Sequence, residues 1–140
     1  MAENLVKLTK VMAQNIRTLH RHLAGGNWFG DHELLAEYYE KVDEMEDAFV
    51  EICIALDYGD CCICEASESY KILPCDRDYS KKEAFSLVKI YFEKLREVIK
   101  EFKASHPELP SGVVSELDNY DYWLFLEGEY KIKRFLTEKE

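Results

Sequence analysis

Two histidines and two carboxylates in the first half of the chain are residue types that bind transition metals: His20, His32, Asp47 and Glu51. Imidazole nitrogens and carboxylate oxygens suit ferrous iron and leave positions open for an oxidant. On a helix that turns about 100° per residue, Asp47 and Glu51 lie about 60° and 100° from His32. The apolar stripe of the same segment centres about 250° from His32, so these three residues point away from the core. In a chain with 28 acidic residues an ordinary solvated helix face would look the same, and both interpretations stay open.

A cluster of cysteines forms a second candidate site. Cys61, Cys62, Cys64 and Cys75 lie close together in the sequence, and Cys61 and Cys64 form a C-x-x-C step. Four thiolates can hold zinc tetrahedrally, and two can form a redox disulfide. The spacing differs from that of a standard zinc ribbon, so reduced cysteines packed in a connecting segment are the alternative interpretation. Cys53 brings the count to five, and an odd count without a secretory signal does not indicate a disulfide framework.

The elements that must position these residues are four amphipathic helices. Apolar residues recur at steps of three and four in each segment, and no alternating strand pattern is visible. Short connections join the first helix to the second and the third to the fourth, whereas a long crossover leaves the second and third parallel. This pattern predicts one all-α domain over residues 1–140, a ferritin-like four-helix bundle. The expected helices cover residues 4–24, 31–58, 80–105 and 111–138, and the crossover, residues 59–79, carries a short helix near 66–73.

Capping residues and glycines set the expected helix boundaries. Asp31 is a plausible N-cap of the second helix, and Gly59 is a plausible stop after it. Ser80 and Glu83 have the spacing of a capping box at the start of the third helix. Gly128 falls inside the last helix, where glycine costs about 1 kcal/mol relative to alanine, so we expect it to permit a close helix contact.

Composition and charge exclude several classes of protein. A chain of 140 residues with 47% hydrophobic and 33% charged residues is neither disordered nor a membrane protein. No secretory signal is visible, so we expect the protein in the cytoplasm. A net charge of −10 without a basic tail makes strong DNA binding unexpected. The sequence also contains no Glu-x-x-His pair, the motif that di-iron sites inside a helix bundle use.

The spacing of the candidate ligands is specific. His20 and His32 lie twelve residues apart, Asp47 follows His32 by fifteen residues, and Glu51 follows Asp47 by four. In this spacing, residues 19–59 resemble the Dps-type mini-ferritins, the DNA-protection-during-starvation family, without a gap. The rest of the chain agrees with that family in helix layout only.

The resemblance implies an iron site between two subunits related by a twofold axis. His20 and His32 would bind iron from one subunit, and Asp47 and Glu51 from its partner. The implied activity is that of a ferroxidase, which oxidises Fe(II), preferentially with hydrogen peroxide, and so protects against oxidative damage. The ferric product would be stored inside a hollow homododecamer held by twofold and threefold contacts.

The chain departs from the family pattern at two positions. Ala36 stands where a third acidic ligand is usual, and Arg21 stands where a Trp usually follows the first histidine. A methyl group cannot bind iron, so Glu40, one turn further along the same face, is the candidate substitute ligand. With one ligand missing, the site is expected to hold one iron well and a second poorly. Trp28 and Tyr39 match aromatic positions of the family and are expected near the site.

Three other functions stay open. Ala36 is compatible with a ferritin-like cage whose iron site is degenerate or inactive. The cysteine cluster is compatible with a zinc-binding or redox helical protein. A plain helical interaction module is disfavoured by the spacing of His20 and His32.

Overall fold

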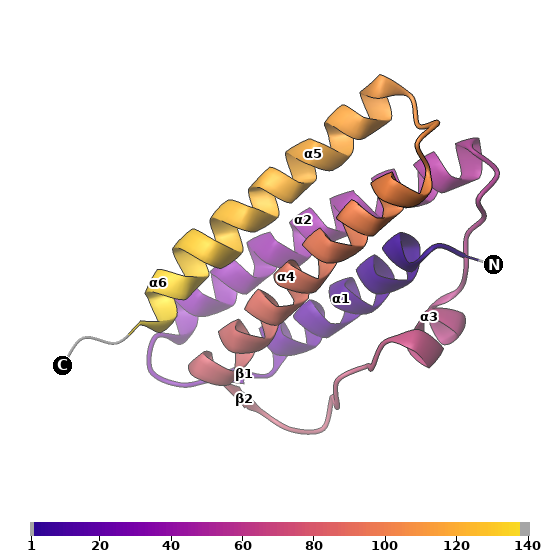
Figure 1. The fold of residues 1–140 in the computed structure, drawn as a ribbon. Coiled ribbons are helices and arrows are strands. Elements are labelled where there is room, and N and C mark those ends of the chain that lie inside the picture. The colour runs from indigo at the N-terminus through magenta and orange to yellow at the C-terminus, as the bar shows by residue number, and fades with distance from the viewer. Residues whose placement is uncertain (1, 138–140) are drawn as a thin grey trace. The chain divides into compact units, whose positions relative to one another are not determined.

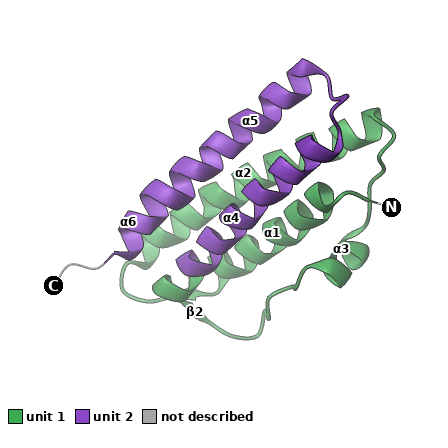
Figure 2. Cartoon of the chain, in the orientation of Figure 1, with its two compact units in different colours: residues 1–84 green, residues 85–140 purple. Residues whose placement is uncertain are grey.

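The computed structural model describes residues 2–137, and Figures 1 and 2 show its helices and its division into two compact units, residues 1–84 and residues 85–140. Almost all of the regular structure is helical, as the sequence predicts. The elements are α1 (Asn4–Arg21), β1 (Leu23–Ala24), α2 (Trp28–Ala55), α3 (Ile63–Ser69), β2 (Tyr79–Ser80), α4 (Lys81–Ser105), α5 (Ser111–Phe125), the π-helix η1 (Leu126–Ile132) and α6 (Lys133–Leu136). None of the described helices combines the length and the apolar character that a membrane span needs.

The core of unit 1 is built by α1 and α2, which lie side by side (Figure 1). The apolar stripes that the sequence predicts are the buried faces of both helices, because a period of 3.6 residues keeps steps of three and four on one side. The fully buried side chains of these stripes include Leu5, Leu8, Met12, Ile16, Leu19, Leu35, Tyr38, Val42, Met45 and Phe49.

The second helix begins and ends earlier than its expected range of 31–58. Asp31 is not its N-cap: this residue lies in the first turn, is 4% exposed, and donates its backbone N–H to the Asn27 carbonyl at 3.1 Å. A carboxylate in the first turn is stabilised by the helix dipole. In the sequence, an acidic residue at this position looks the same as one at the N-cap. At the other end the helix stops at Ala55, because Asp57 adopts a left-handed backbone with φ of 60° before Gly59 is reached.

Four of the described residues form two short strands, which no alternating pattern in the sequence signals. The first helix ends at Arg21 rather than at residue 24, because Leu23 and Ala24 pair in parallel with Tyr79 and Ser80. The Tyr79 N–H also donates to the His22 carbonyl at 2.9 Å. Two-residue strands are too short to show a period of two in the sequence.

The crossover is tied to α1 by the buried side chain of Asn15. Its Nδ2 donates to the Lys71 carbonyl at 2.9 Å, and its Oδ1 accepts the Leu73 N–H at 2.8 Å. The Tyr79 hydroxyl donates to the Pro74 carbonyl at 2.7 Å further along. The short helix of the crossover, α3, covers Ile63–Ser69 and so lies a few residues earlier than expected.

Unit 2 contains the third predicted helix after its first turn, and the described part of the fourth. The third helix spans Lys81–Ser105, one residue shorter than predicted, and the expected cap is present in part: Ser80 Oγ accepts the Glu83 N–H at 3.2 Å. The Glu83 carboxylate binds Arg77 at 2.6 Å instead of returning to residue 80. Residue 138, the expected end of the fourth helix, lies outside the described residues.

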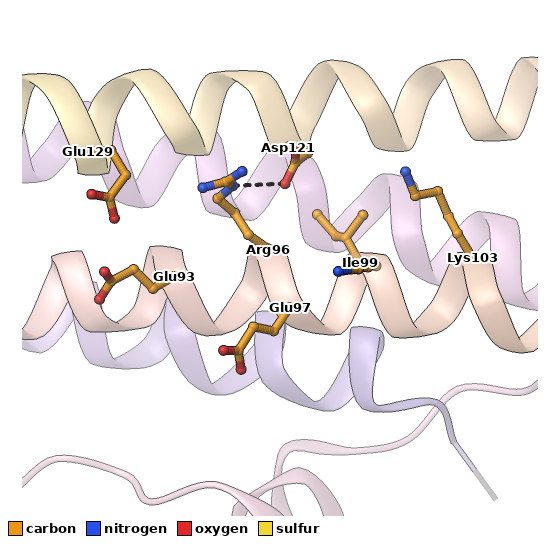
Figure 3. A pocket seen from close by; sticks show the side chains of 8 residues that line it. Glu93, Arg96, Glu97, Ile99, Lys103, Asp121 and Glu129 are labelled. Atoms are coloured by element: carbon orange, nitrogen blue, oxygen red, sulfur yellow. Dashed lines mark hydrogen bonds and ion pairs between the residues drawn. The ribbon is translucent and has the colours of Figure 1, made fainter.

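The fourth helix changes to π-type hydrogen bonding over η1, which no pattern in the sequence signals. Gly128 lies in this segment, and a Cβ atom there would sit 3.5 Å from Cβ of Phe92. This is an ordinary van der Waals distance, so α4 lies next to Gly128, but an alanine would also fit there and the contact does not explain the glycine. A groove of about 550 Å³ also lies between α4 and the α5–η1 helix (Figure 3), and two of its lining residues, Arg96 and Asp121, form an ion pair at 3.0 Å.

Replacing Asn15 with Ala should destabilise the crossover. The change leaves the Lys71 carbonyl and the Leu73 N–H without their buried partner, which is expected to lower the free energy of unfolding by about 2–4 kcal/mol. Urea denaturation followed by circular dichroism measures it. The exposed neighbour Gln14 is the control, and Gln14→Ala should change stability by less than about 0.5 kcal/mol. Equal losses at the two positions would contradict the role of this amide.

Candidate metal centre

The two candidate histidines face each other across the turn between α1 and α2. His20 lies in the last turn of α1, and His32 lies in the second turn of α2. Their rings stack with centroids 3.7 Å apart and an interplanar angle of 21°. The twelve-residue spacing thus spans the end of one helix, the turn and the start of the next.

A reciprocal pair of hydrogen bonds fixes both imidazoles. His20 Nδ1 lies 2.9 Å from the His32 carbonyl oxygen, and His32 Nδ1 lies 2.9 Å from the His20 carbonyl oxygen. A carbonyl only accepts hydrogen bonds, so each Nδ1 carries the proton and donates it. In the neutral ring this tautomer leaves a lone pair on Nε2, the arrangement that metal-binding histidines use. Neither of these two hydrogen bonds uses an Nε2 atom, and whether the Nε2 atoms bind a metal stays a prediction.

Aromatic rings hold the pair on both sides. Trp28 stacks on His32 with centroids 4.2 Å apart and an interplanar angle of 16°, and its indole N–H donates to the Leu23 carbonyl at 2.9 Å. Because His20 and Trp28 are both nearly parallel to the His32 ring, they occupy its opposite faces. Tyr39 meets His20 edge-on at 5.3 Å. Trp28 and Tyr39 thus lie beside the two candidate histidines.

Arg17 supports this cluster and was not identified from the sequence. Its guanidinium lies over the Tyr39 ring at 5.1 Å and forms an ion pair with Asp43. The ring of Tyr39 thus contacts both the Arg17 cation and the His20 ring. A single arginine on a helix carries no sequence signal for such a role, because its ion-pair partner lies on another helix.

Burial lowers the pKa of His20. The loss of solvent around the ring is the main cause, and the charges of His32 and Arg21 act in the same direction. The hydrogen bond to the His32 carbonyl and the carboxylate of Glu40 act in the opposite direction. The net effect favours the neutral ring, which is the form that binds metals.

The candidate carboxylates lie elsewhere on α2. Asp47 and Glu51 are exposed, and at 1.5 Å per residue they lie about 22 and 28 Å along the helix from His32. One chain therefore cannot bring them to the histidines. Among residues 2–137 of a single chain, no group of three or more His, Cys, Asp or Glu side chains is arranged to hold a metal ion. Ligands from two copies are not tested by this finding.

Ala36, where the third acidic ligand is missing, and Glu40, the candidate substitute, also lie on α2. Ala36 is half-buried and lies one helical turn beyond His32. Glu40 is exposed one turn further on, and its charge is felt at His20. Whether Glu40 binds a metal stays a prediction.

The cysteine cluster occupies the crossover around α3. Cys62 is the N-cap of α3, Cys62, Cys64 and Cys75 are exposed, and Cys61 is half-buried. Burial, followed by the charge of Glu65, raises the pKa of the Cys61 thiol. A raised pKa keeps this thiol protonated and weakens it as a nucleophile. The zinc or redox role stays a prediction that no contact among residues 2–137 supports.

Comparison with known proteins identifies the fold. No protein-family model and no curated protein matches the sequence. Solved structures match it at low sequence identity, among them CAIP from Helicobacter cinaedi and Dps from Staphylococcus aureus. CAIP superposes with a TM-score of 0.73 at 17% identity, over 96% of this chain and 100% of that chain. Dps superposes with a TM-score of 0.64 at 16% identity, over 97% of this chain and 92% of that chain.

The chain has a Dps-type ferritin-like fold. The predicted fold class, a ferritin-like bundle with a long crossover that carries a short helix, is thereby confirmed. At these identities the likeness concerns the fold and leaves the chemistry to the residues themselves.

The lowered pKa of His20 predicts a pH dependence. The folded protein holds this imidazole neutral to a lower pH than the unfolded chain, whose reference pKa is 6.5. Stability from this group is therefore fully present above about pH 6.5 and is lost as the pH falls through the lower folded value. NMR titration of the histidines should give His20 a midpoint below 6.5. A midpoint at or above that of the unfolded chain would contradict the structure.

Proposed function

We propose that this protein oxidises Fe(II) at sites shared by two copies of the chain and stores the ferric product. The observation that supports this most is the pair of imidazoles at His20 and His32. Their Nδ1 atoms are both occupied by carbonyl oxygens, so both Nε2 atoms are left to bind a metal. Neutral nitrogen ligands of this kind suit ferrous iron.

The remaining ligands come from a partner chain in this proposal. Asp47 and Glu51 lie too far along α2 to meet the histidines of their own chain, and they are exposed on the surface of that helix. Their spacing of four residues places both on one helix face. Two carboxylates stabilise Fe(III) more than Fe(II) by charge, so they favour the oxidised product.

The proposed oxidant is hydrogen peroxide. One peroxide takes one electron from each of two ferrous ions and, with two protons, becomes two molecules of water. Consuming iron and peroxide together removes the reagents that form damaging radicals, which is the proposed protective role. The acidic chain, with a net charge of −10, draws ferrous ions towards the assembly.

Storage requires a hollow assembly. The Dps-type fold supports self-association, and the proposal takes the homododecamer with its twofold and threefold contacts as the storage form. The cytoplasmic location and the lack of strong DNA binding, both expected from the sequence, belong to the same proposal.

Loss of the carboxylate pair should abolish rapid oxidation. In the variant Asp47→Ala/Glu51→Ala, the initial rate of Fe(II) oxidation with peroxide is expected to fall at least about tenfold, because the oxygen ligands are gone. Stopped-flow absorbance of the ferric product measures this rate. The control is Glu97→Ala/Glu101→Ala, which removes two exposed carboxylates at the same spacing on α4. If both double variants keep the wild-type rate, the ferroxidase proposal fails. The alternative hypothesis, a cage with an inactive iron site, then remains.

Restoring an acid at position 36 should improve the site. Ala36→Asp adds a carboxylate one turn after His32, at the position of the missing ligand, and is expected to raise the number of ions bound at each site from one to two. Titration with Co(II) measures this number, because Co(II) is not oxidised in a solution without peroxide. Ala36→Asn is the control of equal size without the charge. A number of bound ions that Ala36→Asp leaves unchanged would contradict this account of Ala36.

A further inference from the structure

Ion pairs join α1 to α2 along one side of unit 1. Lys10 Nζ binds the Glu46 carboxylate at 3.2 Å, and the Arg17 guanidinium binds the Asp43 carboxylate. We call this row of pairs the charge ladder. The two helices lie side by side and run antiparallel (Figure 1). A residue further along α1 therefore meets a residue earlier on α2, and the pairs of the charge ladder follow one another in that order.

Arg21 continues the charge ladder on α1 without an acidic partner. Lys10, Arg17 and Arg21 are spaced by seven and four residues, which places all three on one face of the helix. Arg21 is exposed, and among residues 2–137 no ion pair or side-chain hydrogen bond joins its guanidinium to another residue. Its charge is felt at His20: burial is the main cause of the lowered pKa of that imidazole, and Arg21 acts in the same direction. Within the described residues, the charge ladder thus ends in an unpaired cation beside a proposed metal ligand.

The matching position on α2 holds a methyl group. Ala36 lies seven residues, or two helical turns, before Asp43 and therefore on the same face. Tyr39, which lies between them in the sequence, meets His20 edge-on at 5.3 Å. Because Arg21 directly follows His20, the same antiparallel register places Arg21 level with the turn that contains Ala36. A carboxylate at this half-buried position would complete the charge ladder, and alanine leaves its place open.

We propose that Arg21 and the open position at Ala36 bind a small oxyanion, phosphate or bicarbonate, which acts as a further ligand of the metal held by the two histidines. The inference rests on the proposed function, because that function places a metal at His20 and His32. A guanidinium binds two oxygens of a phosphate or carboxylate group with parallel N–H donors, and the other side of the anion stays free for a metal. The anion takes the place of the carboxylate that alanine cannot supply.

The charges of the site favour an anion at this position. Arg21 alone repels a divalent cation at the neighbouring histidines, because like charges oppose each other. An anion between the guanidinium and the metal replaces this repulsion with two attractions. The two imidazoles are neutral ligands, so they do not offset the charge of the metal. An added oxyanion also stabilises Fe(III) more than Fe(II) by charge, which favours the oxidised product.

Titration with Co(II) at constant ionic strength tests the site. The wild-type protein is titrated in sodium chloride alone, with added inorganic phosphate, and with added bicarbonate, and Co(II) absorbance gives the affinity. At least one oxyanion should raise the affinity at least about tenfold, through charge-assisted hydrogen bonds to the guanidinium. Both oxyanions also bind Co(II) in solution, which lowers its apparent affinity, so an increase requires a site on the protein. A response to one oxyanion alone supports the proposal and identifies the ligand.

Variants locate the bound anion. Arg21→Gln removes the guanidinium and should abolish the response to the oxyanions. Lys94→Gln is the control: it removes a positive charge from the exposed face of α4 and should keep the response. Ala36→Asp supplies the carboxylate from the chain itself, so it should bind Co(II) more tightly in chloride and gain nothing from either oxyanion. A response that Arg21→Gln retains, or that Lys94→Gln loses, would overturn the proposal.

The outcomes separate this inference from the proposed function. Equal Co(II) affinity of the wild type in all three solutions would overturn the anion site and leave the proposed function in place. The same result is expected if Arg21 pairs with Asp47 of the partner subunit instead of a free anion. Anion-dependent Co(II) binding by a protein that does not oxidise Fe(II) with peroxide would support the anion site and remove the proposed function. A protein that binds no Co(II) in any of the solutions would overturn both.

Discussion

The reciprocal hydrogen bonds between His20 and His32 are the constraint on which the candidate site depends. Each imidazole donates to the other residue's backbone carbonyl, so neither ring can turn without breaking the hydrogen bond that it donates. The backbone geometry of the turn between α1 and α2 therefore determines the ring orientation and the tautomer. Trp28 on the outer face of His32 further limits its motion. A ligand pair held this way loses little freedom when a metal binds.

Elements with a regular period were predictable from the sequence. The buried stripes of α1 and α2 follow from steps of three and four residues, and the start of α4 follows from the hydroxyl of Ser80. The end of α2 was not predictable from Gly59, because Asp57 takes the left-handed backbone first. Capping rules identify residues that can end a helix, but they do not decide between two candidates a few positions apart.

Contacts that join distant backbone atoms were not predictable. Asn15 binds two main-chain groups more than fifty residues away, and main-chain groups carry no sequence identity. The hydrogen bonds between the histidines also go to main-chain carbonyls, so the sequence predicted the spacing of His20 and His32 but not these bonds. Arg17 was missed because its contacts with Tyr39 and Asp43 depend on how α1 and α2 pack.

The two sides of helix α2 have different roles. Its apolar stripe builds the core of unit 1, while its outer face carries His32 at one end and two carboxylates towards the other. In the proposed function, this separation of unlike ligands along one helix leaves each chain with half of a site. The proposed chemistry then depends on association, so an unassembled chain is expected not to oxidise iron on its own. Ala36 lies on the same face, at the position where the Dps-type mini-ferritins usually have a third acidic ligand. The ligand set of this chain is therefore one carboxylate smaller than that of the family it resembles.

Mixed assemblies test the central claim, that each site takes ligands from two chains, most directly. One variant lacks the histidines (His20→Ala/His32→Ala) and the other lacks the carboxylates (Asp47→Ala/Glu51→Ala), and neither should oxidise iron alone. Co-expressed, half of the random pairs are mixed and each mixed pair contains one intact site, so about a quarter of wild-type peroxide-dependent Fe(II) oxidation should return. A mixture as inactive as its components, or a component as active as wild type, would contradict the account.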